Sequence, residues 1–416
     1  MQAENNKNDI KTITFGCRLN AIESEKIANM LRNAVPRALV VNTCAVTGEA
    51  ERQSAQYVRR VARENPNTPV LVTGCAATHD TTPYDKIPNC RIIPNDAKMS
   101  RKAYLDAMTG FDFGMPAKIK VSKPDAPMSK QFIPIQNGCN HDCTYCITRL
   151  LRGPSVSFEY DDILADARAA VANGYSEIVL TGVDSASYHK MYDGAPFLIS
   201  DLCRKLLRDE PGIKRLRLSS MDPASPEIYK IIDLIHENPR MMPHLHLSMQ
   251  SGSDTILRAM RRRHTADMVR DIVAHANDIT FSWDIICGFP GETDELFAET
   301  MRLIADTKPI KIHAFPFSPR PGTPAATMPD QIPKPVAKNR VKIITDAAMR
   351  NRKDFMSAHL GKKASVLVEN DNNGRTTHDI PVTILGATMP NRAICECKIV
   401  GISQESFIVT PTDRHE

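Results

Sequence analysis

The most restrictive feature of this sequence is a regular alternation of short apolar runs with amphipathic, helix-like stretches. Between residues 131 and 319 the alternation occurs six times. Such alternation predicts a parallel sheet flanked by helices, and six units in about 190 residues favour an open partial barrel over a closed eight-stranded one. The six candidate strands are Phe132–Gln136, Glu177–Leu180, Lys214–Ser219, His244–Met249, Ser282–Cys287 and Lys311–Phe315.

Two further segments flank this candidate (β/α)6 barrel, so the expected fold class is α/β with a small C-terminal β-barrel. Residues 9–120 again alternate strand and helix patterns and predict a parallel α/β domain, followed by a linker-like stretch at Lys118–Lys130. A basic helix at Val336–His359 completes a domain over residues 125–357, and residues 358–416 predict a small antiparallel β-barrel. The N-terminal strands are Lys11–Phe15, Arg37–Val41 and Val70–Thr73, the N-terminal helices are Ile22–Ala34 and Ala50–Arg63, and the last strands are Ala364–Glu369, Asp379–Leu385, Ala393–Ile399 and Ser406–Thr410.

Composition narrows the class of protein. Of 416 residues, 42% are hydrophobic and 24% are charged, and there is no run of eighteen apolar residues, so we expect a soluble, cytoplasmic protein without a membrane partner. The polar stretch Met1–Asp9 lacks the apolar core of a signal peptide. Eleven cysteines, an odd number without a secretory signal, argue against a disulfide framework and favour metal or cluster ligation.

The net charge of +5 is unevenly distributed along the chain. Residues 331–363 contain nine Lys/Arg against two Asp/Glu, whereas residues 364–416 contain four against seven. A basic segment of this kind suits contact with nucleic-acid phosphates. A solvated helix face is an equally good interpretation from charge alone.

Three cysteines follow the first barrel strand directly: Cys139, Cys143 and Cys146, in the spacing C-x3-C-x2-C. Three thiolates can hold three irons of a cubane cluster and leave the fourth iron open to bind S-adenosylmethionine (SAM). The carboxyl end of a barrel strand is also where α/β barrels place their active sites. A zinc site is the alternative, with His141 as its fourth ligand.

A second triplet, Cys17, Cys44 and Cys75, follows the three N-terminal strands. The carboxyl ends of parallel strands share one edge of a sheet, and each cysteine precedes a helix whose N-terminus favours a thiolate or an anionic cluster. We therefore expect a second cluster there, although burial in the core is the default for any single cysteine. The remaining cysteines are expected to be structural, namely Cys90, Cys203, Cys287, Cys395 and Cys397.

The motifs around both triplets resemble those of the methylthiotransferases, radical SAM enzymes with an N-terminal cluster domain, a radical SAM barrel and a C-terminal TRAM domain. The resemblance runs from Thr12 to about Thr410. The chain departs from the family pattern at Arg18, Thr148, Val156 and Gly291, which leaves the family's arginine at position 156 without a counterpart. The matching motifs are Gly16–Asn20, Asn42–Thr47, Thr73–Ala77, Asn137–Cys146, Arg152–Ser155, Leu180–Asp184, Arg217–Ser220, His246–Gly252, Asp284–Pro290 and Phe315–Pro319.

This resemblance implies two 4Fe-4S clusters, one on each cysteine triplet, and two SAM molecules per turnover. One SAM would be cleaved at the Cys139 triplet to a 5′-deoxyadenosyl radical, and the other would methylate sulfur held at the Cys17 triplet. The radical would remove hydrogen from C2 of an adenine, whose aromatic C–H is too inert for acid–base chemistry, so both reagents must be positioned together. The implied cofactor-binding residues, with plain packing as the alternative for each, are Tyr145, Thr181, Gly182, Val183, Gln250, Ser251, Gly288 and Phe315.

Three branches of the family differ in substrate: threonylcarbamoyladenosine in tRNA, isopentenyladenosine in tRNA, or an aspartate of a ribosomal protein. Asn42–Thr47, Arg263–His264 and Phe317–Ala326 resemble the threonylcarbamoyladenosine branch. That branch implies three partners: the tRNA anticodon stem-loop, an electron donor such as flavodoxin or ferredoxin, and a sulfur donor. The run Arg261–Arg263 is expected to be a solvated helix face or a phosphate contact. A zinc-stabilised, non-catalytic RNA-binding protein is the alternative from another class.

Overall fold

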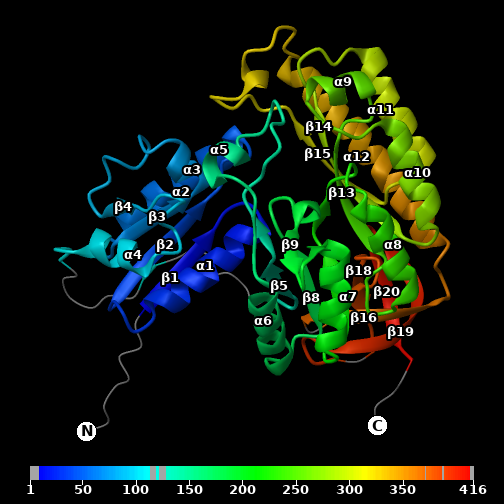
Figure 1. Cartoon of the computed structure of the whole chain (residues 1–416), viewed down its shortest axis with the longest axis horizontal. Coiled ribbons are helices and arrows are strands. Elements are labelled where there is room, and N and C mark those ends of the chain that lie inside the picture. The colour runs from blue at the N-terminus through cyan, green and yellow to red at the C-terminus, as the bar shows by residue number, and fades with distance from the viewer. Residues whose placement is uncertain (1–8, 113–118, 121–127, 371, 387, 413–416) are drawn as a thin grey trace.

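The computed structural model describes residues 9–112, 119–120, 128–370, 372–386 and 388–412 (Figure 1). An N-terminal α/β body, blue to cyan, lies beside a larger body of green to orange elements, and a small red barrel lies below the larger body. Most of the linker-like stretch Lys118–Lys130 and the expected boundary between residues 120 and 125 lie outside the described residues. None of the described helices is long and apolar enough to cross a membrane.

The N-terminal body is built on a four-stranded parallel sheet. Its elements are β1 (Asp9–Thr14), α1 (Arg18–Leu31), β2 (Arg37–Thr43), α2 (Gly48–Glu64), β3 (Val70–Gly74), α3 (Cys75–His79), β4 (Cys90–Ile92) and α4 (Arg101–Met108). The strands are paired in the order β1-β2-β3-β4. Ile27 of α1 and Tyr104 of α4 pack on one face of the sheet, and Val58 of α2 packs on the other. Because both faces are covered, β2 is buried along its whole length.

The larger body is an open half-barrel of parallel strands. These are β5 (Gln131–Pro134), β8 (Glu177–Thr181), β11 (Arg215–Leu218), β12 (Ser220–Met221), β13 (His244–Gln250), β14 (Thr280–Cys287) and β15 (Lys311–Pro316). They form two sheets, β11-β8-β5 and β12-β13-β14-β15, separated at Ser219, whose N–H bonds to the Leu180 carbonyl at 2.9 Å. Within the described residues β5 and β15 are not paired, so the six expected strands and the open barrel are confirmed.

Helices cover the outer face of the half-barrel. They are α6 (Tyr160–Ala172), α7 (Ile199–Asp209), α8 (Glu227–Glu237), α9 (Asp254–Ala259), α10 (Ala266–Ala276), α11 (Asp294–Thr307) and α12 (Lys334–Ser357), with the short α5 (Thr148–Arg152) after the cysteine loop. The side chains of Thr265 and Thr293 accept hydrogen bonds from the first turns of α10 and α11, as N-cap residues do. Trp283 of β14 is fully buried in the shared core.

The last segment forms a closed barrel of five strands: β16 (Lys363–Asn370), β17 (Asn373–Thr376), β18 (Pro381–Ile384), β19 (Ile394–Ser403) and β20 (Ser406–Pro411). Four of its pairings are antiparallel, as expected, but β18 pairs with β20 in parallel. A ring with an odd number of strands cannot alternate direction throughout, so a purely antiparallel barrel was the wrong expectation. Cys395 and Cys397 lie on one face of β19 with their sulfurs 3.6 Å apart.

Buried charges join the small barrel to the lower, N-terminal ends of the half-barrel strands. Glu177, at the start of β8, lies 2.8 Å from Arg217 and 3.0 Å from Lys130. Lys130 is also 3.0 Å from Asp379 of the small barrel. Burial acts to raise the pKa of Glu177, but the cations Arg217 and Lys130 outweigh it and lower that pKa to about 2.

Candidate functional site

Cys139, Cys143 and Cys146 lie on the loop between the half-barrel's first strand and α5. Each sulfur receives one N–H donor: the backbone of His141 donates to Cys139 at 3.4 Å, the backbone of Thr148 to Cys146 at 3.4 Å, and the Arg262 guanidinium to Cys143 at 3.7 Å. Hydrogen bonds to cysteine sulfur are among the means by which a protein stabilises and tunes an iron–sulfur cluster. The loop is therefore organised around three sulfur atoms.

The protonation of these thiols is consistent with a cluster site. Burial, followed by the repulsion of neighbouring charges that include the other two cysteines, raises the pKa of Cys139 to about 11. Burial also raises the pKa of Cys146. A bound metal removes the proton of a coordinating thiol outright, so a cluster would overcome these two shifts. The donor set fits a 4Fe-4S cluster with one iron left open.

Cys17, Cys44 and Cys75 come together at the carboxyl edge of the N-terminal sheet. The strand register aligns Thr14 with Asn42 and Asn42 with Thr73, so each cysteine lies two or three residues beyond an aligned position. Burial, with smaller contributions from the charges of Cys17 and Cys75, raises the pKa of Cys44 to about 11. The three side chains also line one cavity. Like the first triplet, these three cysteines form a set of neighbouring thiols that could bind a cluster.

Gly16, immediately before Cys17, leaves the space in which these sulfurs meet. Its φ is +90°, and a Cβ atom built on it would lie 2.6 Å from the Sγ atom of Cys44. Any larger residue would therefore displace Cys44 as well as strain the backbone.

A buried ionic network connects the two cysteine triplets. Arg152 of α5 lies 3.0 Å from Glu23 of α1 and donates to the side chain of Asn20 at 2.6 Å. Glu23 also pairs with buried Lys98, and Asn20 donates to the backbone carbonyl of Thr43, next to Cys44. Burial acts to lower the pKa of Arg152, but Glu23 and Cys75 outweigh it and raise that pKa. The helix that follows one cysteine loop thus binds the helix that begins at Cys17.

A second contact joins the two bodies on the other side of the site. Arg320, on the segment after β15, pairs with Glu51 of α2, and Glu51 also bonds to the His79 ring at 2.7 Å. The backbone N–H of Gly48 donates to the Ser318 hydroxyl at 3.1 Å. The two triplets are therefore held by contacts on both sides of the gap between the bodies.

Two adjacent cavities occupy that gap. The larger, about 1280 Å³, contains the Cys17 triplet on one wall, and the smaller, about 270 Å³, contains the Cys139 triplet. The two cavities share lining residues and are therefore adjacent. The shared residues are Val46, Thr148, Val183, Ser220 and Asp284.

The structure brings six of the eight expected cofactor residues to these cavities. Tyr145, Gln250 and Phe315 line the smaller cavity, Thr181 and Gly182 line the larger, and Val183 lines both. Ser251 and Gly288 line neither cavity. The Ser251 hydroxyl lies 3.4 Å from the hydroxyl of Thr300 on α11, and a Cβ atom on Gly288 would meet Ala337 of α12 at 2.6 Å.

The run Arg261–Arg263 is divided between surface and interior. The side chains of Arg261 and Arg263 are 55% and 57% exposed, as expected, but that of Arg262 is only 7% exposed and lies 2.8 Å from Asp222. Reading this run as a solvated face was therefore wrong for Arg262, which lines the smaller cavity beside Cys143. The sequence analysis also did not predict Asp222 or Arg152 as site residues. The available signals were that Asp222 follows a strand and that Arg152 begins the Arg152–Ser155 motif.

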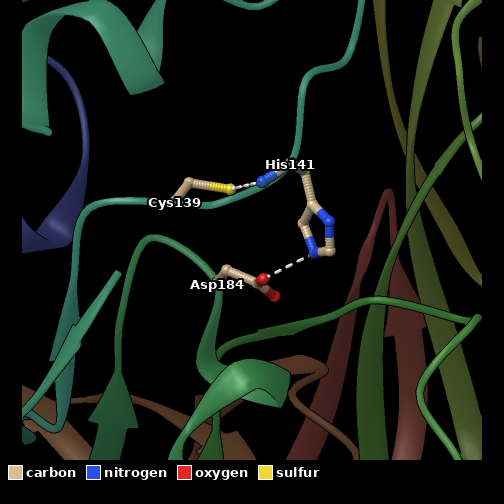
Figure 2. A group of neighbouring side chains, drawn as sticks. All are labelled: Cys139, His141 and Asp184. Atoms are coloured by element: carbon tan, nitrogen blue, oxygen red, sulfur yellow. Dashed lines mark hydrogen bonds and ion pairs between the residues drawn. The ribbon is translucent and has the colours of Figure 1, made fainter. Parts of the chain in front are cut away.

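Cys139, His141 and Asp184 form a compact group beside the smaller cavity (Figure 2). Their ligand atoms lie within 4.8 Å of one another, and the His141 ring is 2.8 Å from the Asp184 carboxylate. Arg263 also lies 3.3 Å from the His141 ring. The histidine considered as a zinc ligand is thus already paired with a carboxylate.

Known sequences and family models resemble this chain along most of its length. The Radical SAM superfamily matches residues 133–304, and a family described as Uncharacterized protein family UPF0004 matches residues 9–92. The chain is 37% identical to "Threonylcarbamoyladenosine tRNA methylthiotransferase MtaB" of Rickettsia prowazekii, over 94% of this chain and 95% of that protein. It is 31% identical to a protein of the same name in Bacillus subtilis, over 86% and 84%. A "tRNA-2-methylthio-N(6)-dimethylallyladenosine synthase" of Thermobifida fusca is 31% identical, over 92% and 81%.

Solved structures agree on the fold. The radical SAM methyltransferase TsrM of Kitasatospora setae superposes with a TM-score of 0.53 at 15% identity, over 70% of this chain and 65% of that one. The radical SAM enzyme OxsB gives 0.51 at 10% identity, over 85% and 57%. Radical SAM enzymes use a 4Fe-4S cluster and SAM, which the three-cysteine loop and its adjoining cavity suit. With relatives above 30% identity along nearly its whole length, the chain belongs to the methylthiotransferase family of radical SAM enzymes.

Proposed function

We propose that this enzyme converts N6-threonylcarbamoyladenosine, next to the anticodon of tRNA, into its 2-methylthio derivative. The observation that carries the proposal is the placement of two three-cysteine sets on the walls of two adjacent cavities. Inserting a methylthio group at an inert aromatic carbon needs a radical source and a sulfur donor near the same atom. An alternative with one structural zinc site and no catalysis leaves the second triplet and the cavities without a use.

The relatives support the choice of substrate. Four relatives named threonylcarbamoyladenosine tRNA methylthiotransferase are 31–37% identical over 86–94% of the chain. Relatives named for dimethylallyladenosine, the isopentenyl substrate, reach 31–34% over 85–92%. The highest identity and the widest coverage belong to a relative named for threonylcarbamoyladenosine, so we take that substrate as the first candidate. Methylthiolation of isopentenyladenosine is the second candidate. Modification of a ribosomal-protein aspartate is a third.

In this proposal Cys139, Cys143 and Cys146 hold the cluster that binds SAM. Together, the bound cluster and SAM supply a 5′-deoxyadenosyl radical. Tyr145, Val183, Gln250 and Phe315 line the same cavity, so they enclose the bound SAM and exclude water from it. Arg262 holds a positive charge and an N–H donor against Cys143, and Asp222 holds the guanidinium in that position.

Cys17, Cys44 and Cys75 hold a second cluster in the same proposal, and two SAM molecules are used per turnover. The Glu23–Lys98–Arg152 network fixes the distance between the two cysteine sets, because breaking a buried ion pair costs about 3–5 kcal/mol. The adenine of the substrate enters the larger cavity. An electron donor and a sulfur donor, which the chemistry requires, complete the set of partners.

The substrate is tested with matched tRNAs. Reconstituted enzyme is incubated with SAM, a reductant and tRNA that carries threonylcarbamoyladenosine, isopentenyladenosine or unmodified adenosine at the same position. We expect a 2-methylthio product from the first tRNA and at least tenfold less from the others, measured by mass spectrometry of nucleosides. Turnover of the isopentenyl tRNA alone would move the enzyme to the sister branch. Modification of a ribosomal protein instead of any tRNA would remove the RNA substrate altogether.

The basic helix α12 is the proposed contact for tRNA phosphates. Its cations fall into two sets: Arg340 pairs with Glu292 at 2.7 Å and Arg352 donates to the Glu405 backbone, so both are structural, whereas five others are exposed. Lys334 is the first residue of the helix, and the other four exposed cations are Lys338, Lys342, Arg350 and Lys353.

Replacing these four exposed residues with glutamine should weaken tRNA binding and leave SAM cleavage without substrate unchanged. The slope of log affinity against log salt concentration should become shallower by about 0.7–0.9 for each phosphate that the variant no longer neutralises. The matched control changes four exposed cations on the outer helices α6, α7 and α8, namely Arg168, Arg204, Arg208 and Lys230. Equal weakening in both quadruple variants would show a general charge effect and remove α12 from the interface.

A further inference from the structure

The wall of the larger cavity opposite the Cys17 triplet is polar. It is built by three neighbouring strands, β13, β14 and β15, whose register places Ser282 beside both His246 and Lys311, and Asp284 beside His313. His246, Asp284, Lys311 and His313 all line the cavity. An interior-facing wall of a half-barrel would ordinarily be filled by apolar side chains, so this set of polar groups calls for a polar ligand.

Most of these groups are already bonded to one another. The His246 ring lies 2.9 Å from the Asp284 carboxylate through Nε2 and 2.8 Å from the Ser282 hydroxyl through Nδ1. The ring of His313 lies beside that of His246, tilted to it, with centroids 5.6 Å apart. The wall is therefore held rigid before any ligand arrives.

Lys311 is the exception. Its side chain is half-buried, and among the residues that the structure describes its ammonium group has no hydrogen-bond or ion-pair partner. Burial lowers its pKa, and the charge of Asp379 opposes that shift, but Asp379 is already paired with Lys130 at 3.0 Å. A half-buried cation without a partner is costly unless a ligand supplies the opposite charge.

The other charged residues considered at this cavity are either exposed or already paired. Arg18, Glu25 and Arg32 of α1 are exposed at its edge, and Arg152 is paired with Glu23. Lys311 begins β15, and Phe315 of the smaller cavity is four residues further along that strand, about 13 Å away at the rise of a strand. A group bound by Lys311 would therefore extend from the cysteine sets toward the floor of the half-barrel.

We propose that this wall, with Lys311 as the charged residue, recognises the carboxylate of the threonylcarbamoyl group and so selects the substrate. The inference rests on the proposed function and concerns the same site. The threonylcarbamoyl group adds a carboxylate, a hydroxyl and a urea to N6 of adenine, on the other side of the ring nitrogen N1 from C2. A purine with C2 at the clusters can thus direct this group along β15. An isopentenyl group would leave Lys311 unpaired, and a site built to pair a polar group rejects analogues that lack it.

The test uses synthetic anticodon stem-loops with three forms of the modified base: threonylcarbamoyladenosine, its carboxylate methyl ester, and unmodified adenosine. Binding is measured by fluorescence anisotropy competition with the reconstituted protein. Wild-type protein should prefer the free carboxylate to its ester by about 10- to 100-fold, the range of a charged hydrogen bond in a buried site. Lys311→Met should remove this preference and leave the affinity for the unmodified stem-loop unchanged. Lys311→Arg should restore part of it.

The matched control is Lys308→Met, an exposed lysine three residues earlier that lines neither cavity. It should keep the wild-type preference. Retention of the preference in Lys311→Met, with wild-type protein preferring the carboxylate, would overturn this inference alone. Wild-type protein that does not distinguish the carboxylate from the ester would also overturn it, whereas wild-type turnover of only the isopentenyl substrate would overturn the proposed function. Thermal unfolding by circular dichroism checks that each variant is folded.

Discussion

Replacing Cys139, Cys143 and Cys146 together with alanine is expected to remove about half of the iron and to abolish SAM cleavage. The reconstituted wild-type protein should contain about eight irons, four on each triplet, and show the broad absorption near 400 nm of iron–sulfur sites. Without its three thiolates the first site cannot hold a cluster, so no open iron remains for SAM. Iron and sulfide analysis, together with chromatography of 5′-deoxyadenosine, measures both effects.

The control for this variant is Cys287→Ala. Cys287 is fully buried at the end of β14, and burial raises the pKa of its thiol to about 12. It lines neither cavity, so its loss should leave both the iron content and SAM cleavage intact. Full iron retention in the triple variant would disprove these three residues as ligands. Stoichiometric zinc in place of iron in the wild-type protein would instead revive the zinc alternative.

Replacing Cys17, Cys44 and Cys75 with alanine is expected to separate the two halves of the reaction. The loop with Cys139 is on another body of the molecule, so SAM should still be cleaved to 5′-deoxyadenosine. Methylthio transfer should fall below detection, because the proposed site for the sulfur donor is lost. Product analysis of tRNA nucleosides and of 5′-deoxyadenosine in one reaction shows both outcomes.

Cys90→Ala is the matched control for this second variant. Cys90 begins β4 of the same sheet and is buried, but it lies outside the cavity that contains the triplet. It should retain about eight irons and full transfer. Methylthiolated nucleoside from the triple variant would remove the N-terminal cluster from the mechanism, whereas loss of SAM cleavage in that variant would show that the two sites do not fold independently.

Much of the fold could be predicted from local patterns. Apolar runs of strand length, separated by amphipathic stretches, located the six barrel positions and the first three N-terminal strands, because burial on both faces requires continuous apolar sequence. The strands that were missed are short or polar. The sequence of β17 is Asn373–Thr376 with Gly374 inside it, and the hairpin β9 (His189–Tyr192) and β10 (Ala195–Leu198) carries few buried side chains.

The sequence also predicted that Cys17, Cys44 and Cys75 would lie close together. Parallel strands in register end at one edge, so residues that follow them are brought together whatever their separation in the chain. The register Thr14–Asn42–Thr73 confirms this.

The residues that support the cysteines could not be found in this way. Arg262 lies within a run of three arginines, and nothing in that run distinguishes the one that turns inward. Arg152 and Glu23 are separated by 129 positions and meet only because α5 docks against α1. Lys311 belongs to an ordinary strand pattern, and its lack of a partner among the described residues depends on what its neighbours in space already bind.

The sequence by itself determined the family and the main order of strands and helices, and it supplied the six cysteines that we propose as cluster ligands. Each of these depends on residue type and on spacing along the chain. The tertiary structure alone decided that the two triplets face adjacent cavities and that one arginine of three contacts a cysteine sulfur. It also decided that the half-buried Lys311 has no hydrogen-bond or ion-pair partner among the described residues. Those features depend on how separate surfaces pack together. Packing brings together groups that are far apart in sequence, and the pairing of each buried charge is settled only when all of its neighbours are in place.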